Sequence, residues 1–240
     1  HCIIKGYFLY PLKGAVRLAT DCSEFCIKNM PSFFPTNLKG GALSEVGATL
    51  PQEIAFTFSN AIVYVEELMK RGISADDAAA RITFFISITE DIFEEVAKIR
   101  AARRIWARIT RDRFGARISR AQALTFTAFV PGRFCQVEWP ELNIARAGFA
   151  CLAGALAGCQ GMLLPAWDEP FAIPTERSHG IALGTQQIVA EEIGVNKTAD
   201  PLGGDFSFDF FTDRMEEEIL QHMKEIDEWG GCIEIDRRHL

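Results

Sequence analysis

The feature that most constrains the fold of this 240-residue chain is a repeated alternation of short apolar runs and long amphipathic segments. The run at residues 81–88 is β-branched and aromatic, as buried strands are. A helical pattern follows from about residue 90 to 111, with acids at its start and arginines at its end, which complements the helix dipole. Strands that alternate with helices need right-handed crossovers, so a parallel sheet is predicted.

This alternation of strand and helix occurs four times after an initial helix. The predicted strands lie at residues 37–40, 81–88, 123–130 and 161–164. The predicted helices lie at residues 14–30, 51–71, 74–80, 90–111, 141–158, 176–193 and 212–229. Four parallel strands form either a small open α/β layer or half of an eight-stranded barrel, because a whole barrel needs about 250 residues in compact units.

The clearest helix start lies at Thr49. A threonine is a good N-cap residue, Pro51 suits the first turn, and Gln52 stands three residues on, as a capping box requires. Gly72 is a natural residue just past the end of this helix.

Composition excludes several classes of protein. The chain is 48% hydrophobic with a formal charge of −7, which supplies a core and indicates no nucleic-acid partner. It has no run of about 18 uncharged apolar residues, so no membrane span is expected. The seven cysteines form no C-x-x-C motif and indicate reduced thiols in a cytoplasm. The four histidines are scattered, so no metal site is expected.

Two charged regions have more than one interpretation. The segment 98–120 is rich in arginine, and we expect an exposed helix end and loop there, or else a docking surface for an acidic partner. The acidic helix near the end of the chain is expected to be solvated. Because the sequence starts with His1 and lacks a signal-peptide pattern, we also expect it to be an excised or processed piece of a longer protein.

Several motifs follow one another in a specific order. They are 47–56 (GATLPQEIAF), 81–85 (RITFF), 97–107 (AKIRAARRIWA), 168–170 (DEP), 174–176 (PTE) and 200–204 (DPLGG). Together they closely resemble the large, catalytic subunit of the adenosylcobalamin-dependent acyl-CoA mutases, typified by methylmalonyl-CoA mutase. The resemblance runs from about residue 5 to 235.

The resemblance implies that residues 1–240 form the second half of a substrate-binding TIM-type (β/α)₈ barrel, an α/β fold of parallel units. The first half barrel, and the domain that ligates cobalt through a D-x-H-x-x-G motif, would lie on a partner chain or have been removed, since that motif is absent here. The implied cofactor is adenosylcobalamin, whose cobalt–carbon bond breaks to give the radical that rearranges an acyl-CoA. The implied activity is therefore that of an isomerase.

Four residues correspond to binding positions of the family. Arg81 and Phe85 match positions that contact the CoA ester, although Arg81 could instead pair with an acid of the preceding helix, Asp76 or Asp77. Glu45 and Glu169 match acids near the adenosyl group, where Glu169 would accept hydrogen bonds from ribose hydroxyls. Glu45 could instead be a helix-start acid.

At other positions the chain departs from the family. Gly41 and Ala42 stand where the family has a tyrosine, which drives homolysis and shields the radical, and a histidine, which binds the thioester carbonyl. Thr127 and Phe129 replace a histidine and a glutamine near the substrate. Lys5 is a weak match to an arginine that grips a carboxylate. No catalytic residue is therefore secure, and loss of a charge-capable donor typically costs about 2–4 kcal/mol of transition-state stabilisation.

Two main hypotheses follow. In the first, the chain is a mutase component whose apolar acyl pocket, shaped by Phe126 and Phe129, takes a larger and less polar acyl group. In the second, it is a non-catalytic mutase-like subunit or scaffold that assembles with a partner chain. A stand-alone enzyme is disfavoured because no nucleophile–base constellation occurs. Since half a barrel has two open sheet edges, we expect a homo- or hetero-oligomer.

Overall fold

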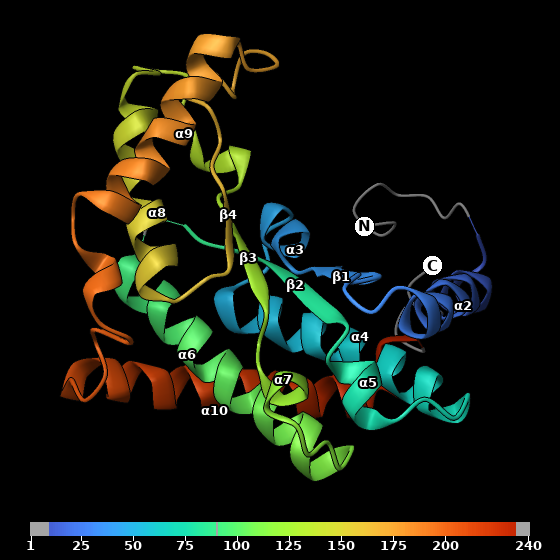
Figure 1. Ribbon diagram of the computed structural model, residues 1–240. Coiled ribbons are helices and arrows are strands. Elements are labelled where there is room, and N and C mark those ends of the chain that lie inside the picture. Colours follow the sequence, from blue (N-terminus) through green and yellow to red (C-terminus); the bar gives the residue numbers. More distant parts are fainter. Residues whose placement is uncertain (1–9, 90, 234–240) are drawn as a thin grey trace.

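The computed structural model describes residues 10–89 and 91–233. Within this part of the chain, four parallel strands pair in sequence order into one sheet (Figure 1). They are β1 (Thr36–Lys39), β2 (Ile82–Ser87), β3 (Phe126–Phe129) and β4 (Gly161–Leu163). Each predicted strand is found, and β3 is shorter than predicted because the residues before it follow a short helix, α7 (Ser119–Gln122).

Helices connect the strands and pack mainly against one side of the sheet. The long ones are α2 (Leu12–Asn29), α4 (Leu50–Lys70), α6 (Ile92–Arg108), α8 (Leu142–Leu156), α9 (Glu176–Glu191) and α10 (Phe206–Glu228). The short ones are α3 (Gly41–Glu45), α5 (Ala75–Ala79), α7, a π-helical turn η1 (Ile109–Arg113), and the 3-10 turns η2 (Gly132–Phe134) and η3 (Val195–Lys197). Figure 1 shows α10 running beneath α4 and α6, which it contacts.

The core lies between the strands and these helices. Ile82, Phe84 and Ile86 alternate along β2 and are fully or almost fully buried. The Phe84 ring lies 5.3 Å from that of Phe58 on α4 and 4.9 Å from that of Trp106 on α6. Since side chains alternate along a strand, the intervening residues face the other side of the sheet.

We call that other side the inner face. It carries Asn37 and Lys39 of β1, Thr83 and Phe85 of β2, Thr127 and Phe129 of β3, and Gly161 and Leu163 of β4. Phe126 belongs to the opposite, helix-facing side, where it is 1% exposed, so the prediction that it shapes an acyl pocket is wrong. The error arises because successive side chains in a strand point to opposite faces of the sheet, so Phe126 and Thr127 cannot line the same pocket.

The predicted helix start at Thr49 is confirmed. The Thr49 hydroxyl accepts a hydrogen bond from the Gln52 N–H, and the Gln52 side chain accepts one from the Thr49 N–H, 3.0 Å away. Pro51 occupies the first turn. This capping box fixes the start of the longest helix that contacts β1 and β2.

Removing this cap should weaken the fold measurably. We expect Thr49→Ala to lower the free energy of unfolding by about 1 kcal/mol, because the Gln52 N–H loses the hydroxyl that accepts its hydrogen bond. Urea unfolding followed by circular dichroism measures the change. Thr49→Ser retains the accepting oxygen and should stay close to the wild type; an equal loss in both variants would show that the cap oxygen is not the cause.

The arginine-rich segment forms an exposed helix end and loop from Arg108 onward, as predicted, whereas Arg100 and Arg104 within α6 pair with acids of the same chain. Arg100 pairs with Asp200 and Asp209, Arg104 with Asp213, and Arg108 with Glu216. Three acids of α10, Asp209, Asp213 and Glu216, are therefore paired with α6, while Glu217, Glu218 and Asp227 are exposed, as expected of a solvated acidic helix. This helix also starts at residue 206, earlier than predicted, since the Asp205 carboxylate accepts hydrogen bonds from the N–H groups of Ser207 and Phe208.

No helix in residues 10–89 and 91–233 is both long enough and apolar enough to cross a membrane.

Candidate functional site

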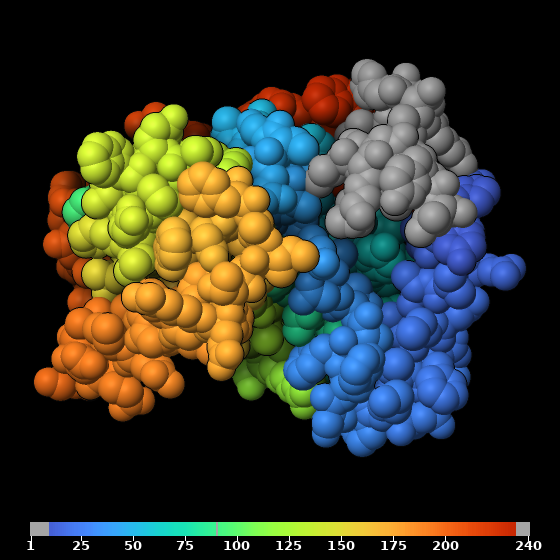
Figure 2. All heavy atoms as spheres, turned by 90° about the horizontal axis from the view of Figure 1, so that it is seen from above, coloured from blue at the N-terminus to red at the C-terminus, as the bar shows by residue number. Residues whose placement is uncertain are grey.

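The candidate site lies at the carboxyl ends of the strands, where the loops after β1, β3 and β4 meet. The guanidinium of Arg133, which follows β3, donates a hydrogen bond to the hydroxyl of Ser44 on α3 at 2.9 Å. Gly132 lies against the side chain of Glu169 in the loop after β4, since a Cβ on this glycine would be 3.2 Å from the Glu169 Cγ. Figure 2 looks onto this edge and shows a hollow between the blue segment around β1 and the yellow-orange segment after β4.

An aromatic pair lines the inner face near this edge. The rings of Phe85 and Phe129 stack with centroids 4.8 Å apart. The Phe129 ring also occupies the space beside Gly41, because a Cβ on Gly41 would lie 2.7 Å from the Phe129 Cδ1. A side chain at position 41 and the ring of Phe129 therefore exclude each other in this arrangement.

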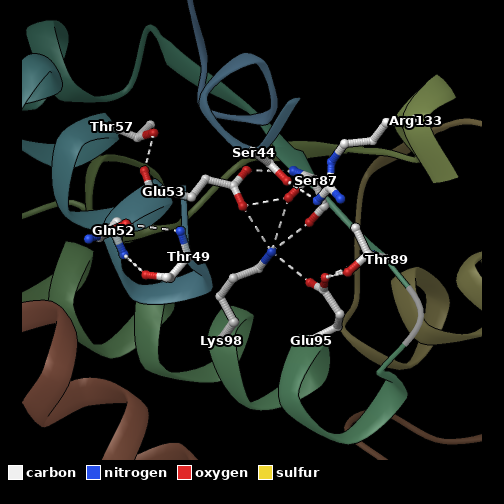
Figure 3. A network of polar contacts seen from close by, with 10 residues as sticks. All are labelled: Ser44, Thr49, Gln52, Glu53, Thr57, Ser87, Thr89, Glu95, Lys98 and Arg133. Atoms are coloured by element: carbon white, nitrogen blue, oxygen red, sulfur yellow. Dashed lines mark hydrogen bonds and ion pairs between the residues drawn. The ribbon is translucent and has the colours of Figure 1, made fainter. Parts of the chain in front are cut away.

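A buried polar network supports the carboxyl end of β2 from the helix side (Figure 3). Lys98 on α6 lies 3.1 Å from a carboxylate oxygen of Glu53 on α4 and 2.6 Å from one of Glu95, and these three side chains are 0% exposed. Its ammonium group also donates a hydrogen bond to the Ser87 carbonyl at 2.7 Å. The Glu95 carboxylate accepts hydrogen bonds from the N–H and hydroxyl of Thr89.

The same network determines the backbone geometry near Gly41. The Ser87 N–H and hydroxyl donate to the Glu53 carboxylate at 2.7 and 2.5 Å. A Cβ on Gly40 would be 2.5 Å from the Thr57 hydroxyl and 3.4 Å from a Glu53 oxygen. Because residues 40 and 41 are glycines, the backbone that follows β1 can pack directly against Glu53 and Ser87.

Burial affects the protonation of this network. It raises the pKa of Glu95 above its ordinary value, against the opposing influence of Lys98. Burial alone would lower the pKa of Lys98, but the neighbouring Glu53 and Glu95 carboxylates outweigh it and raise that pKa. The lysine therefore stays charged, with two carboxyl groups sharing one cation.

The predicted CoA-contacting residues lie along one strand. Arg81 immediately precedes β2 at its amino end, and its guanidinium donates hydrogen bonds to the carbonyls of Pro31 and Phe33. It forms no ion pair with the acids of α5 named as alternatives. Phe85 lies four residues further on the same face, about 13 Å along the strand.

The other predicted site residues are spread along the inner face and its carboxyl edge. Thr127 is next to Phe85 in the strand register and partly buried. Glu45, on α3, and Glu169, after β4, are both exposed, and neither is in an ion pair within the described residues. Ala42 is partly buried on α3. Lys5 lies outside the residues that the structure describes.

Sequence reasoning missed the buried network and did not single out Lys39. A signal for the network existed, because Glu95 and Lys98 are three residues apart on one helix and Glu53 falls beside the apolar stripe of another. Charged residues on a core-facing side are almost never fully buried unless they are paired. Lys39 was visible as a cation on a predicted strand.

Five of the cysteines that the structure describes are free thiols: Cys22, Cys26, Cys135, Cys151 and Cys159. Within residues 10–89 and 91–233, no group of three or more His, Cys, Asp or Glu could hold a metal ion. Cys135 lies near Glu169, and burial together with that carboxylate raises the pKa of its thiol to about 11. A thiol in this environment is a poor nucleophile at neutral pH.

Comparisons with known proteins identify the family. A family model described as methylmalonyl-CoA mutase matches residues 1–237. The chain is 38% identical over 238 residues to the 2-hydroxyisobutanoyl-CoA mutase large subunit of Aquincola tertiaricarbonis, covering 97% of the chain and 42% of that subunit. It is 34% identical over 229 residues to methylmalonyl-CoA mutase of Rhizobium meliloti, covering 95% of the chain and 32% of that protein. With the human mitochondrial methylmalonyl-CoA mutase it shares 30% identity over 229 residues, again 95% of the chain and 30% of that protein.

The chain therefore belongs to the methylmalonyl-CoA mutase family, as its motifs predicted. Its fold is α/β, and its parallel strand–helix units form part of a TIM-type barrel. The chain spans less than half the length of the relatives named above, 42% in the first case.

Proposed function

We propose that this chain forms the CoA-binding half of the substrate barrel in an adenosylcobalamin-dependent acyl-CoA mutase, an isomerase of carbon skeletons. The observation that carries the proposal is the aromatic pair on the inner face, where Phe85 stacks on Phe129 beside Gly41 at the carboxyl edge. Barrels of this type hold their substrates at that edge. The names of the relatives, 2-hydroxyisobutanoyl-CoA mutase and methylmalonyl-CoA mutase, support an acyl-CoA substrate.

The residues of this chain would bind and shield the substrate. Arg81 and Phe85, on one face of β2, suit a long thioester that lies along the strand. Thr127 and Phe129 would pack around the acyl group, and Lys5 would meet a substrate carboxylate if the acyl group has one. An acyl pocket walled by aromatic rings excludes water, which protects reactive intermediates from side reactions.

The cofactor proposal concerns two carboxylates. Glu45 and Glu169 are exposed at the carboxyl edge and free of ion pairs within the described residues, so both fit as acceptors for the ribose hydroxyls of the adenosyl group. When bound, adenosylcobalamin supplies the carbon-centred radical that starts the rearrangement. The D-x-H-x-x-G motif whose histidine ligates cobalt in the family does not occur in this sequence, so that ligand would come from a cobalamin-binding domain or subunit.

The partners of this proposal follow from the sheet. β1 and β4 are its edge strands in the described structure, and the inner face between them is partly exposed. A complementary first half barrel would pair with both edges, so we propose a homo- or hetero-oligomer or a longer polypeptide as the working form.

Radical formation tests the proposed function. We expect the chain, assembled with its first half barrel, cobalamin-binding component and adenosylcobalamin, to give a cob(II)alamin–radical EPR signal when a branched acyl-CoA is added, together with the rearranged product. Omitting the acyl-CoA is the control and should give no signal. Failure of every acyl-CoA tested to give a signal, despite normal assembly, would contradict the mutase proposal.

A non-catalytic subunit is the second candidate function. The observation that favours it is Gly41, because the position at which the family has tyrosine holds no side chain and has no room for one. This candidate predicts normal assembly and unchanged turnover of the complex when Arg81 or Glu169 is replaced by alanine. The mutase proposal predicts reduced turnover for both variants.

A further inference from the structure

Lys39 ends β1 and lies on the inner face. Its neighbour Leu38 is buried in the core, so alternation directs Lys39 the other way. Its register partner is Phe85, and its ammonium nitrogen lies 5.9 Å from the centroid of that ring. The Phe85 ring in turn stacks on Phe129. The Lys39 ammonium group therefore lies beside the pair of aromatic rings, and Lys39 itself immediately precedes Gly40.

Lys39 is also the one ionisable residue in the four described strands. Its side chain is exposed and makes no ion pair in the part of the chain that the structure describes, unlike the arginines of α6, which pair with α10. An ammonium group held beside apolar rings is less fully hydrated than one in open water. An acceptor oxygen from a ligand on this face would gain from binding it.

We propose that Lys39 is a substrate-binding residue whose ammonium group holds an oxygen atom of the acyl group, with the Phe85 and Phe129 rings packed against the neighbouring carbons. This inference rests on the proposed function and deepens it, because it identifies a charged side chain beside the aromatic pair that would bind the substrate. The shared chemistry is an acceptor oxygen, which a thioester carbonyl or a free carboxylate can supply.

The test is a comparison of ligands that differ by one group. Butyryl-CoA and S-butyl-CoA differ in the thioester carbonyl, whereas succinyl-CoA has a carboxylate in place of the terminal methyl group of butyryl-CoA. Affinities of the assembled protein are measured by titration calorimetry for the wild type, Lys39→Met and Lys39→Arg. Lys224→Met is the matched control, because it removes a lysine of α10 whose side chain is 70% exposed.

We expect Lys39→Met to weaken binding about ten-fold or more for the ligand whose oxygen Lys39 holds, and Lys39→Arg to retain most of it. A loss for butyryl-CoA but not S-butyl-CoA assigns the contact to the carbonyl. A loss for succinyl-CoA alone assigns it to a carboxylate. Lys224→Met should match the wild type with every ligand.

Two results would overturn the inference while leaving the proposed function intact. One is unchanged affinity of Lys39→Met for every thioester. The other is an equal loss for S-butyl-CoA, which would place the lysine against a different part of CoA. If the wild type binds no CoA thioester at all, the proposed function itself fails and the inference fails with it.

Discussion

Replacing Lys98 with methionine is expected to lower the free energy of unfolding by about 3–5 kcal/mol, because the change leaves the Glu53 and Glu95 carboxyl groups buried without their cation. Methionine matches the length of the lysine stem, so loss of packing contributes little. Such a loss is a large part of the total stability of a typical domain. Urea unfolding followed by circular dichroism, with soluble yield as a second measure, tests this expectation.

Two comparisons separate the charge effect from general damage. Lys70→Met removes a lysine from an exposed pair with Glu67 and should leave the unfolding midpoint close to that of the wild type. The variant that combines Lys98→Met with Glu53→Gln and Glu95→Gln carries no buried charge and should recover much of the loss. If the triple variant is less stable than Lys98→Met alone, the uncompensated carboxylates are not the cause.

The Lys98→Met effect should also depend on pH. Without the cation, the Glu95 carboxyl group, whose pKa is raised by burial, holds its proton to higher pH than in the unfolded chain, where Glu has its ordinary pKa of 4.5. The folded state then binds more protons than the unfolded state, so its stability falls as pH rises above that value. The destabilisation by Lys98→Met should therefore be smaller at pH 5 than at pH 8, and a difference that is independent of pH would contradict the assignment.

The sequence predicted the parallel α/β order well because each strand is a compact apolar run and each long helix has its own boundary signals. The capping box at Thr49 is local, and local hydrogen bonds can be read from spacing. Arg104 and Asp213 are more than a hundred residues apart, so their pairing needs the packing of α10 on α6. Pairings of this kind depend on tertiary structure and are not encoded in a local pattern.

At the candidate site, too, the sequence located individual residues but not the tertiary contacts between them. The sequence comparison located Gly41 and Phe129 as two separate departures from the family pattern. The contact between them appears only when the loop after β1 is packed over the end of β3. Similarly, Lys39 lay on a predicted strand, but the side of the sheet that it faces depends on the register with Phe85.

Adding a side chain at Gly41 should be costly for a steric reason. We expect Gly41→Ala to lower the free energy of unfolding by about 1–3 kcal/mol, since the new Cβ would lie 2.7 Å from the Phe129 ring and 3.4 Å from the Ser87 backbone nitrogen. Thermal and urea unfolding measure the loss. Gly180→Ala is the matched control: Gly180 is in α9 with nothing within 4 Å of a Cβ, and alanine should stabilise that helix slightly.

The two departures at positions 41 and 129 are coupled by this contact. In a Phe129→Gln background the ring is gone, so Gly41→Ala should cost less than about 1 kcal/mol, and the two changes should be non-additive. By the same reasoning, Gly41→Tyr should fold poorly alone and much better together with Phe129→Gln, the two residues that the family pattern has at these positions. If the cost of Gly41→Ala is the same in both backgrounds, Phe129 is not the obstacle. A non-additive result would mean that loss of the tyrosine and gain of Phe129 are one structural change, in which an aromatic ring enters the same space from β3 instead of from α3.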